Sequence, residues 1–290
     1  MKWTNKYNID PAIAAAVIGG EERGDVGDAS VTQLIRPPQM AYLERLHWDE
    51  IEQDVSDGLY RLTGQIVHQI VQAVDEEGAV KERRLALDVG GWKVTGQIDL
   101  WRPSKELVDY KETSVWSFIL GEKVEWEEQV NYYRLFCEHH DLPVERAKIA
   151  AILRDWKRSQ YQREGEDGDY PPIPFLNHPI YLWPINDAMS RLRQRVAEHQ
   201  AAAKGDYRPC TEDERWAKPT TWAVKKKGGR YALRGGAGFL DPASAQDFAR
   251  RQRFPTEIEK RPGQNTRCEG YCRAAVWCKQ AKALGVEAVA

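Results

Sequence analysis

Two aspartates and a lysine stand close together in residues 96–113, GQIDLWRPSKELVDYKET. Asp99 and Asp109 are equidistant from Ser104, so a turn centred there would make them cross-strand neighbours with Cβ atoms about 5 Å apart. Like charges so placed repel each other unless a cation lies between them. Lys111 lies two positions after Asp109, and side chains two apart on a strand share a face. A divalent metal would relieve the repulsion, with the lysine beside it.

This combination of groups indicates phosphodiester hydrolysis. Hard cations such as Mg²⁺ or Mn²⁺ take one or two carboxylates, several waters and a substrate phosphate as ligands. A water bound to such a cation loses its proton more readily, and a neighbouring lysine can orient it or offset charge that develops on the phosphate. The spacing alone also fits a solvent-exposed charged hairpin without a metal.

Three further polar side chains lie on predicted helices. Gln129 and Tyr133 are four residues apart within the helix predicted over 116–139, so they share a face. His68 lies in the helical region predicted over 39–74, in a segment with one apolar face. That face consists of Leu62, Ile66, Ile70 and Val74. A lone histidine there is commonly a core residue, but an imidazole added to two carboxylates would favour Mn²⁺ over Mg²⁺.

Four short motifs follow one another along the chain: GQIVH (64–68), GQID (96–99), VDYK (108–111) and QVNYY (129–133). Together they resemble the motif series of the RecB-like branch of the PD-(D/E)XK nuclease superfamily. In that family the series has the form Gly-x-x-x-His, Gly-x-x-Asp, Asp-x-Lys and Gln-x-x-x-Tyr. One such motif means little, but the ordered set of four is specific.

The resemblance implies an α/β fold with a restriction-endonuclease-like core, which is a mixed central sheet flanked by helices. It implies a metal-dependent deoxyribonuclease, more specifically an exonuclease that acts at DNA ends or on single strands. His68, Asp99 and Asp109 would bind Mg²⁺ or Mn²⁺, and Lys111 would activate or position the water. Gln129 and Tyr133 would help to bind DNA near the scissile phosphate. The stretches SVTQLIRPPQ, LRDW and CTEDERW also resemble phage and prophage nuclease-like proteins.

These residues need a sheet and a helix to position them. The segments 83–89, 92–101 and 106–113 have strand-like patterns and are separated by Gly90-Gly91 and by RPSK, so they predict an antiparallel meander. Further along, the patterns predict strands over 148–156 and 179–183, a helix over 186–205, a possible strand over 230–234 and a helix from Asp241-Pro242. The first 27 residues look loosely organised. We expect a nuclease domain over 1–205 with a helical N-terminal part, and a basic C-terminal appendage over 206–290.

The chain has 290 residues, and its 42% hydrophobic content is enough to bury a core. No segment resembles a signal peptide or a membrane helix, so the expectation is a soluble cytoplasmic protein. The formal net charge is −2, but residues 218–240 carry six basic residues and no acidic one. Such a stretch could face DNA phosphates, or it could be a solvated loop. Trp216, Trp222 and Tyr231 could stack on unpaired bases, or form a small core.

Four of the five cysteines lie in the appendage. Cys268, Cys272 and Cys278 have the spacing C-x3-C-x5-C, and Cys210 could complete a four-thiolate site for a [4Fe–4S] cluster or structural Zn²⁺. Cys137 lies on an apolar helix stripe, and it is expected to be a core thiol.

The cysteine pattern resembles that of iron–sulfur RecB-like nucleases, including the CRISPR-associated exonucleases, which imply a [4Fe–4S] cluster. Those relatives have a far upstream cysteine and a terminal C-x2-C-x5-C. Here the terminal spacing has one extra residue, and Cys210 would have to replace the upstream ligand. We therefore favour the cluster, with zinc as the alternative and unligated thiols as a third possibility. A bound cluster or zinc would hold the basic stretch near DNA.

Two other classes of function fit parts of the sequence. One is a catalytically silent DNA-binding or assembly subunit that partners a helicase, a recombinase or a CRISPR adaptation complex. The other is a metal-sensing or structural cysteine protein. The intact set of Asp99, Asp109 and Lys111 favours the enzyme, since neither alternative needs all three.

Overall fold

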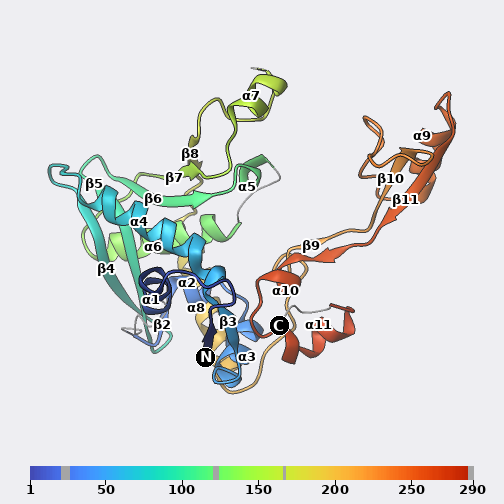
Figure 1. Ribbon diagram of the computed structural model, residues 1–290. Coiled ribbons are helices and arrows are strands. Elements are labelled where there is room, and N and C mark those ends of the chain that lie inside the picture. The colour runs from blue at the N-terminus through green and yellow to red at the C-terminus, as the bar shows by residue number, and fades with distance from the viewer. Residues whose placement is uncertain (21–26, 120–123, 166–167, 287–290) are drawn as a thin grey trace. The chain divides into compact units, whose positions relative to one another are not determined.

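The computed structural model describes residues 1–20, 27–119, 124–165 and 168–286. Its backbone divides into two compact units. The first unit comprises Met1–Ala41 and Asp49–Tyr207, and the second comprises Tyr42–Trp48 and Arg208–Ala290. Figure 1 shows the elements of both. The functional division expected at residue 205 stays a prediction.

A mixed six-stranded sheet forms the centre of the first unit. Its strands are β2 (Ala29–Ser30), β4 (Val80–Val89), β5 (Trp92–Arg102), β6 (Glu106–Thr113), β7 (Arg146–Leu153) and β8 (Phe175–Ile180). The order is β2-β5-β6-β7-β8, and β4 pairs with β5 along its other edge. The pairs β2–β5 and β6–β7 are parallel, whereas β4–β5, β5–β6 and β7–β8 are antiparallel. The expected α/β class with a mixed central sheet is confirmed.

A two-residue turn at Gly90 and Gly91 starts the meander. Both residues have positive φ, 57° and 81°, which a hairpin turn of this kind requires and which glycine adopts without strain. Val89 therefore pairs directly with Trp92. The antiparallel meander predicted from the sequence is confirmed.

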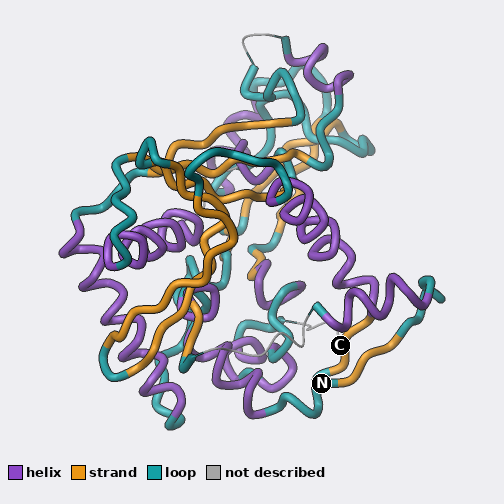
Figure 2. Tube along the Cα trace, turned by 90° about the vertical axis from the view of Figure 1, so that its left-hand side faces the viewer, coloured by secondary structure: helices purple, strands orange, loops and turns teal. Residues whose placement is uncertain are grey.

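The first unit also contains helical elements, and Figure 2 draws helices in purple and strands in orange. They are α1 (Pro11–Gly19), α2 (Val31–Leu34), α3 (Pro38–Leu46, whose last residues belong to the second unit), η1 (Val55–Gly58), α4 (Leu59–Gln72), α5 (Trp116–Ile119), α6 (Val124–His139), α7 (Arg158–Glu164) and α8 (Ile185–Ala203). The described part of the unit also holds a small parallel pair, β1 (Lys2–Thr4) with β3 (Glu52–Asp54).

The helices α4 and α6 approach the sheet from opposite faces (Figure 1). On β6, Tyr110 lies edge-on to His68 of α4, whereas the next residue, Lys111, bonds to Gln129 of α6. Successive residues of a strand point to opposite faces, so the two helices must lie on either side. The face under α6 carries the main core, where Phe136 and Cys137 are fully buried. Cys137 is thus a core thiol, as expected.

Several sequence predictions need correction. Residues 2–4 and 11–19 are ordered elements rather than loose chain, because Asp10 caps α1 by accepting hydrogen bonds from two backbone N–H groups. Much of the predicted apolar face is exposed: Ile66 and Ile70 of α4 are 47% and 64% exposed, and Val74, which follows the helix, is 60% exposed. The last strand of the sheet ends at Ile180 instead of covering 179–183. Residues 230–234 contribute only a single bridge, from Ala232 to Lys225.

The second unit is built from short elements. They are β9 (Ala217–Lys218), β10 (Thr221–Lys226), α9 (Pro242–Arg250), β11 (Thr256–Arg261), β12 (Gln264–Asn265), α10 (Thr266–Gly270), η2 (Ala275–Trp277) and α11 (Lys279–Ala283). Strands β10 and β11 are antiparallel, as are β9 and β12. Asp241 caps α9 as expected, by accepting a hydrogen bond from the Ser244 N–H.

Within the described residues, none of the helices combines the length and the apolar character that crossing a membrane requires.

Candidate metal centre

The two aspartates lie where β5 and β6 separate. The ladder between these strands pairs Leu100 with Val108, Trp101 with Leu107 and Arg102 with Glu106, which centres the turn on Ser104. Asp99 and Asp109 occupy the next position of this register, where no further bridge forms between the two strands. The Tyr110 N–H instead donates to Oδ2 of Asp99 at 2.7 Å. The register expected from the sequence is therefore present.

The Asp99 carboxyl is an electrostatically stressed group. Its side chain is only 10% exposed. Burial, followed by the negative charge of Asp109, raises the pKa of Asp99 to about 7, against the opposing effects of His68 and Lys111. Two buried carboxyl groups, each negative when ionised, thus lie close together where the paired part of the hairpin ends. A bound cation would stabilise both in their charged forms.

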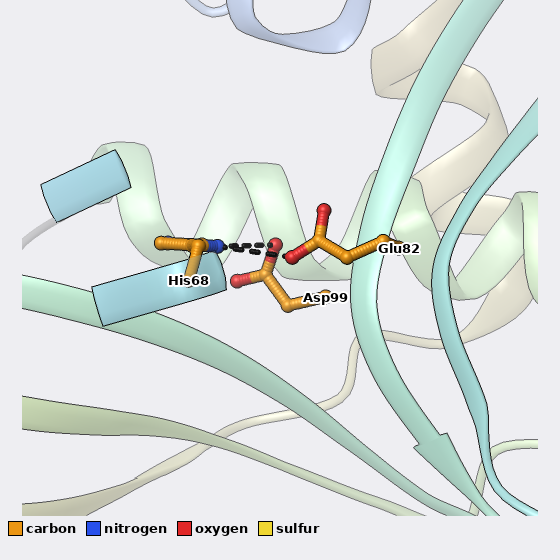
Figure 3. Close-up of side chains that lie close together, drawn as sticks. All are labelled: His68, Glu82 and Asp99. Atoms are coloured by element: carbon orange, nitrogen blue, oxygen red, sulfur yellow. Dashed lines mark hydrogen bonds and ion pairs between the residues drawn. The ribbon is translucent and has the colours of Figure 1, made fainter. Parts of the chain in front are cut away.

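His68 of α4 reaches the same place from the opposite side of the cluster, as Figure 3 shows. Its Nδ1 atom lies 3.5 Å from Oδ1 of Asp99 and 3.2 Å from Oε1 of Glu82. The hydrogen bond to Glu82 is the main cause of a raised pKa for His68, and the charges of Asp99 and Asp109 add to it. One ligand atom from each of His68, Glu82 and Asp99 lies within 4.8 Å of the other two.

Glu82 is the site residue that sequence reasoning missed. It lies on β4, and the register around the Gly90–Gly91 turn places it opposite Asp99, although these two residues make no bridge while their neighbours do. The signal was available in the sequence, since positions 82 and 99 are equidistant from that turn. None of the four motifs includes position 82, so the motif series does not predict Glu82 as a site residue.

Asp109 and Lys111 form an ion pair beside this cluster. Nζ of Lys111 lies 2.8 Å from Oδ2 of Asp109, whose side chain is 3% exposed. Among the described residues, no donor makes a well-aligned hydrogen bond to this buried oxygen. A buried carboxylate oxygen with an incomplete set of partners fits a place for a cation. The donor set of carboxylates and one imidazole fits Mg²⁺ and suits Mn²⁺ better.

Gln129 and Tyr133 of α6 continue from Lys111 into the core. Lys111 donates to Oε1 of Gln129 at 3.1 Å, and Nε2 of Gln129 donates to the Tyr133 hydroxyl at 3.0 Å. Both side chains are buried, 6% and 5% exposed. The contacts found are therefore with the lysine and with each other. A direct contact of these two residues with DNA stays a prediction.

Gly96 explains the glycine of its motif. A Cβ atom added there would lie 2.8 Å from Cε1 of Tyr133 and 3.2 Å from Cε2 of Phe136. The Tyr133 ring thus packs directly on the β5 backbone, which requires a residue without a side chain. At Gly64, the glycine of the first motif, an added Cβ would meet no atom within 4 Å.

The four remaining cysteines all lie in the second unit, and none of them forms a disulfide within the described residues. Cys278 is buried in a small cluster with Leu43, Ala274 and Ala281, against which Cys268 and Cys272 pack. Cys210 is tied to α11 through Gln280, which accepts from its N–H at 2.9 Å and donates to its carbonyl at 2.8 Å.

The cysteine thiols interact electrostatically with one another. Burial, then Glu214 and then the other three cysteines raise the pKa of Cys210 to about 12. Burial is likewise the main cause that raises the pKa of Cys272 to about 11, with smaller contributions from Cys268 and Cys278. A soft cation would lower these pKa values by stabilising the thiolates. Binding of zinc or an iron–sulfur cluster by these four cysteines stays a prediction.

The basic stretch of the second unit is partly neutralised. Lys225 forms ion pairs with Glu257 at 3.3 Å and Glu259 at 3.1 Å across the β10–β11 pair. Trp216 packs against Tyr271, and its ring lies 4.1 Å from the Arg267 guanidinium. Tyr231 is 76% exposed. Of the aromatic residues considered for base stacking, Tyr231 is the one that is open to solvent.

Comparison with known proteins adds little to this picture. No protein-family model and no curated protein matches the chain. The solved structures similar to it include the protein SSO0001, with a TM-score of 0.45 and 16% identity over 65% of this chain and 84% of that one. They also include a candidate exonuclease from Eubacterium rectale, with a TM-score of 0.31 and 12% identity over 53% of this chain and 55% of that one.

Proposed function

We propose that this protein is a Mg²⁺- or Mn²⁺-dependent deoxyribonuclease, an exonuclease of the RecB-like branch of the PD-(D/E)XK superfamily with a restriction-endonuclease-like core. The observation that carries the proposal is the convergence of His68 and Asp99 with the buried Asp109–Lys111 pair. These four residues come from three of the four motifs. An ordinary charged hairpin would not bury two like charges and surround them with an imidazole and an ammonium group.

His68, Asp99 and Asp109 would hold the cation, and each residue of the site then has a defined task. When bound, the ion supplies Lewis-acid activation of the scissile phosphodiester and of the attacking water. Lys111 acts as a hydrogen-bond donor, since its contacts with Asp109 and Gln129 are both to acceptor oxygens. As an ammonium group it orients the water and offsets charge that develops on the phosphate.

The hydrogen bonds behind Lys111 fix its position. Gln129 accepts from the ammonium group and is itself oriented by the Tyr133 hydroxyl, so the lysine is not free to rotate away from the site. A correctly placed ammonium group raises the rate, because the lysine already has the geometry that the reaction requires. Gln129 and Tyr133 thus support the chemistry as positioning residues on this proposal.

The test is digestion of linear DNA, labelled at either end, and of closed circular DNA. Each is incubated in Mg²⁺ and in Mn²⁺ with the full chain or with Asp109→Ala. We expect the linear DNA to be degraded from an end by the native protein and left intact by the variant. Salt-sensitive DNA binding without any product, under either metal, would favour the silent DNA-binding subunit that partners a helicase or recombinase.

For the second unit we propose that Cys210, Cys268, Cys272 and Cys278 hold a [4Fe–4S] cluster, with structural Zn²⁺ as the rival. The mutual electrostatic influence of the four thiols and their shared location support this assignment. A cluster or zinc ion there would tie Cys210 to the C-terminal segment and so stabilise the unit.

A further inference from the structure

We propose that Glu82 is a direct ligand of the cation and that Gln97 is its positioning residue. The inference rests on the proposed function only in taking the cluster as a cation site. It adds a fourth protein ligand from a strand outside all four motifs.

Glu82 is as well placed as Asp99 to bind a cation beside His68. Oε1 of Glu82 lies closer to Nδ1 of His68 than Oδ1 of Asp99 does, 3.2 Å against 3.5 Å. The side chains of Glu82 and Asp99 are similarly buried, 15% and 10% exposed. Figure 3 shows both carboxylates directed at the same ring nitrogen. An ion that binds His68 and Asp99 would therefore meet Glu82 as well.

Gln97 binds one of the two carboxylate oxygens of Glu82 and leaves the other for the cation. Its Nε2 donates to Oε2 of Glu82 at 2.5 Å, and its own Oε1 accepts from the Arg84 guanidinium at 3.3 Å. The amide is thus oriented from both ends, and it leaves Oε1 of Glu82 facing the cluster. A bond that orients a ligating carboxylate in this way typically raises metal affinity.

The strand is distorted at the place where Glu82 is needed. Glu82 has φ of 46°, a left-handed conformation that favours glycine. On the facing strand, Ile98 packs in the main core and Leu100 in a separate cluster with Val108 and Ala150, although positions two apart share a face in a regular strand. The regular alternation of side chains between the two faces of the sheet is therefore interrupted at positions 82 and 99, which face each other.

The donor groups of the cluster suit a divalent cation. Glu82 and Asp99 each place a carboxylate oxygen beside Nδ1 of His68, at 3.2 Å and 3.5 Å. Lys111 is paired with Asp109 at 2.8 Å, while Glu82 and Asp99 each offer one ligand atom within 4.8 Å of a ligand atom of His68. The three carboxylates of Glu82, Asp99 and Asp109, together with one imidazole, predict tighter binding of Mn²⁺ than of Mg²⁺.

The experiment is a Mn²⁺ titration of the full chain without DNA, followed by the electron paramagnetic resonance signal of free Mn²⁺. The variants are Glu82→Gln, Glu82→Gly and Gln97→Ala, with Asp88→Asn as the control, since Asp88 is an exposed acid on the same strand. Glu82→Gly suits the positive φ and so keeps the backbone conformation. His68→Ala identifies the site.

We expect both Glu82 variants to weaken Mn²⁺ binding by at least about tenfold, Gln97→Ala to weaken it by a smaller factor, and Asp88→Asn to leave it unchanged. Mn²⁺ binding of both Glu82 variants at the native affinity would overturn the inference. If that result came with native DNA cleavage, the proposed function would stand without Glu82. Binding that depends on Glu82 in a protein that cuts no DNA would leave the ligand assignment in place and refute the nuclease.

Discussion

Nζ of Lys111 lies 2.8 Å from Oδ2 of Asp109 and donates to Oε1 of Gln129 at 3.1 Å. The first partner comes from its own strand and the second from the helix on that face of the sheet. Because Gln129 is held in turn by Tyr133, a chain of polar contacts runs from the site into the core.

Gly96→Ala should displace Tyr133, because the new Cβ would lie 2.8 Å from Cε1 of its ring. Overpacking of this kind costs about 1–3 kcal/mol of unfolding free energy, and loss of the Gln129 bond should slow DNA cleavage as well. Gly64→Ala is the matched control, since it meets no atom and replaces a helical glycine. Urea denaturation and a cleavage assay measure both effects. Equal behaviour of the two variants would show that Tyr133 does not depend on Gly96.

Gln129→Ala should reduce the rate of the chemical step by about 10- to 100-fold through a misplaced Lys111. DNA affinity should stay unchanged, because Gln129 is buried. Single-turnover cleavage and a separate DNA-binding titration in Ca²⁺ distinguish the two quantities. Weakened DNA binding with an unchanged rate would instead support the direct DNA contact predicted from the motif series.

The contribution of Asp99 to the stability of the metal-free protein should fall as the pH rises from about 4 to about 7. The pKa of Asp99 is raised to about 7 in the folded protein, so this residue binds more protons in the folded than in the unfolded state across this window. Its contribution is then fully present below the unfolded pKa and is lost as the pH rises, with a limiting slope of about 1.4 kcal/mol per pH unit.

The comparison for this pH effect is Asp99→Asn, which cannot ionise. In excess chelator, the stability of Asp99→Asn relative to the native protein should increase with pH over the same window. Urea denaturation at a series of pH values gives this difference directly. A difference that does not depend on pH would show that Asp99 titrates normally.

Cys268→Ser should lower the iron and acid-labile sulfide content of anaerobically purified protein and destabilise the second unit, because one of four thiolates is lost. Cys137→Ala is the control, since this thiol is buried in the first unit. Metal analysis of both variants measures the effect. Colourless native protein with one zinc ion per chain would replace the cluster by zinc.

Much of the fold could be predicted from the sequence because its signals are local. The Gly90–Gly91 turn and the symmetry about Ser104 set the strand register, and the register places Asp99 and Asp109 at the end of the ladder. The apolar face of α4 was visible as a pattern, but exposure depends on what packs against it, and the described residues leave Ile70 largely open.

The site was predicted less completely. Glu82 lies outside the four motifs. Its place in the cluster depends on a left-handed backbone conformation, which a sequence pattern predicts only where glycine or asparagine occurs. The burial of Gln129 and Tyr133 was also not predictable from their spacing, because four residues on a helix share a face whether that face meets solvent or core.

The most direct test of the nuclease proposal is the rate at which end-labelled linear DNA is cleaved in Mn²⁺ by the native protein and by Lys111→Ala. Lys148→Ala, a change to an ion-paired lysine on β7, is the control. The proposal predicts cleavage that chelator abolishes, a loss of at least about 100-fold in Lys111→Ala, and a native rate in the control. Equal rates in all three proteins, or no cleavage by the native protein in any divalent metal, would contradict it.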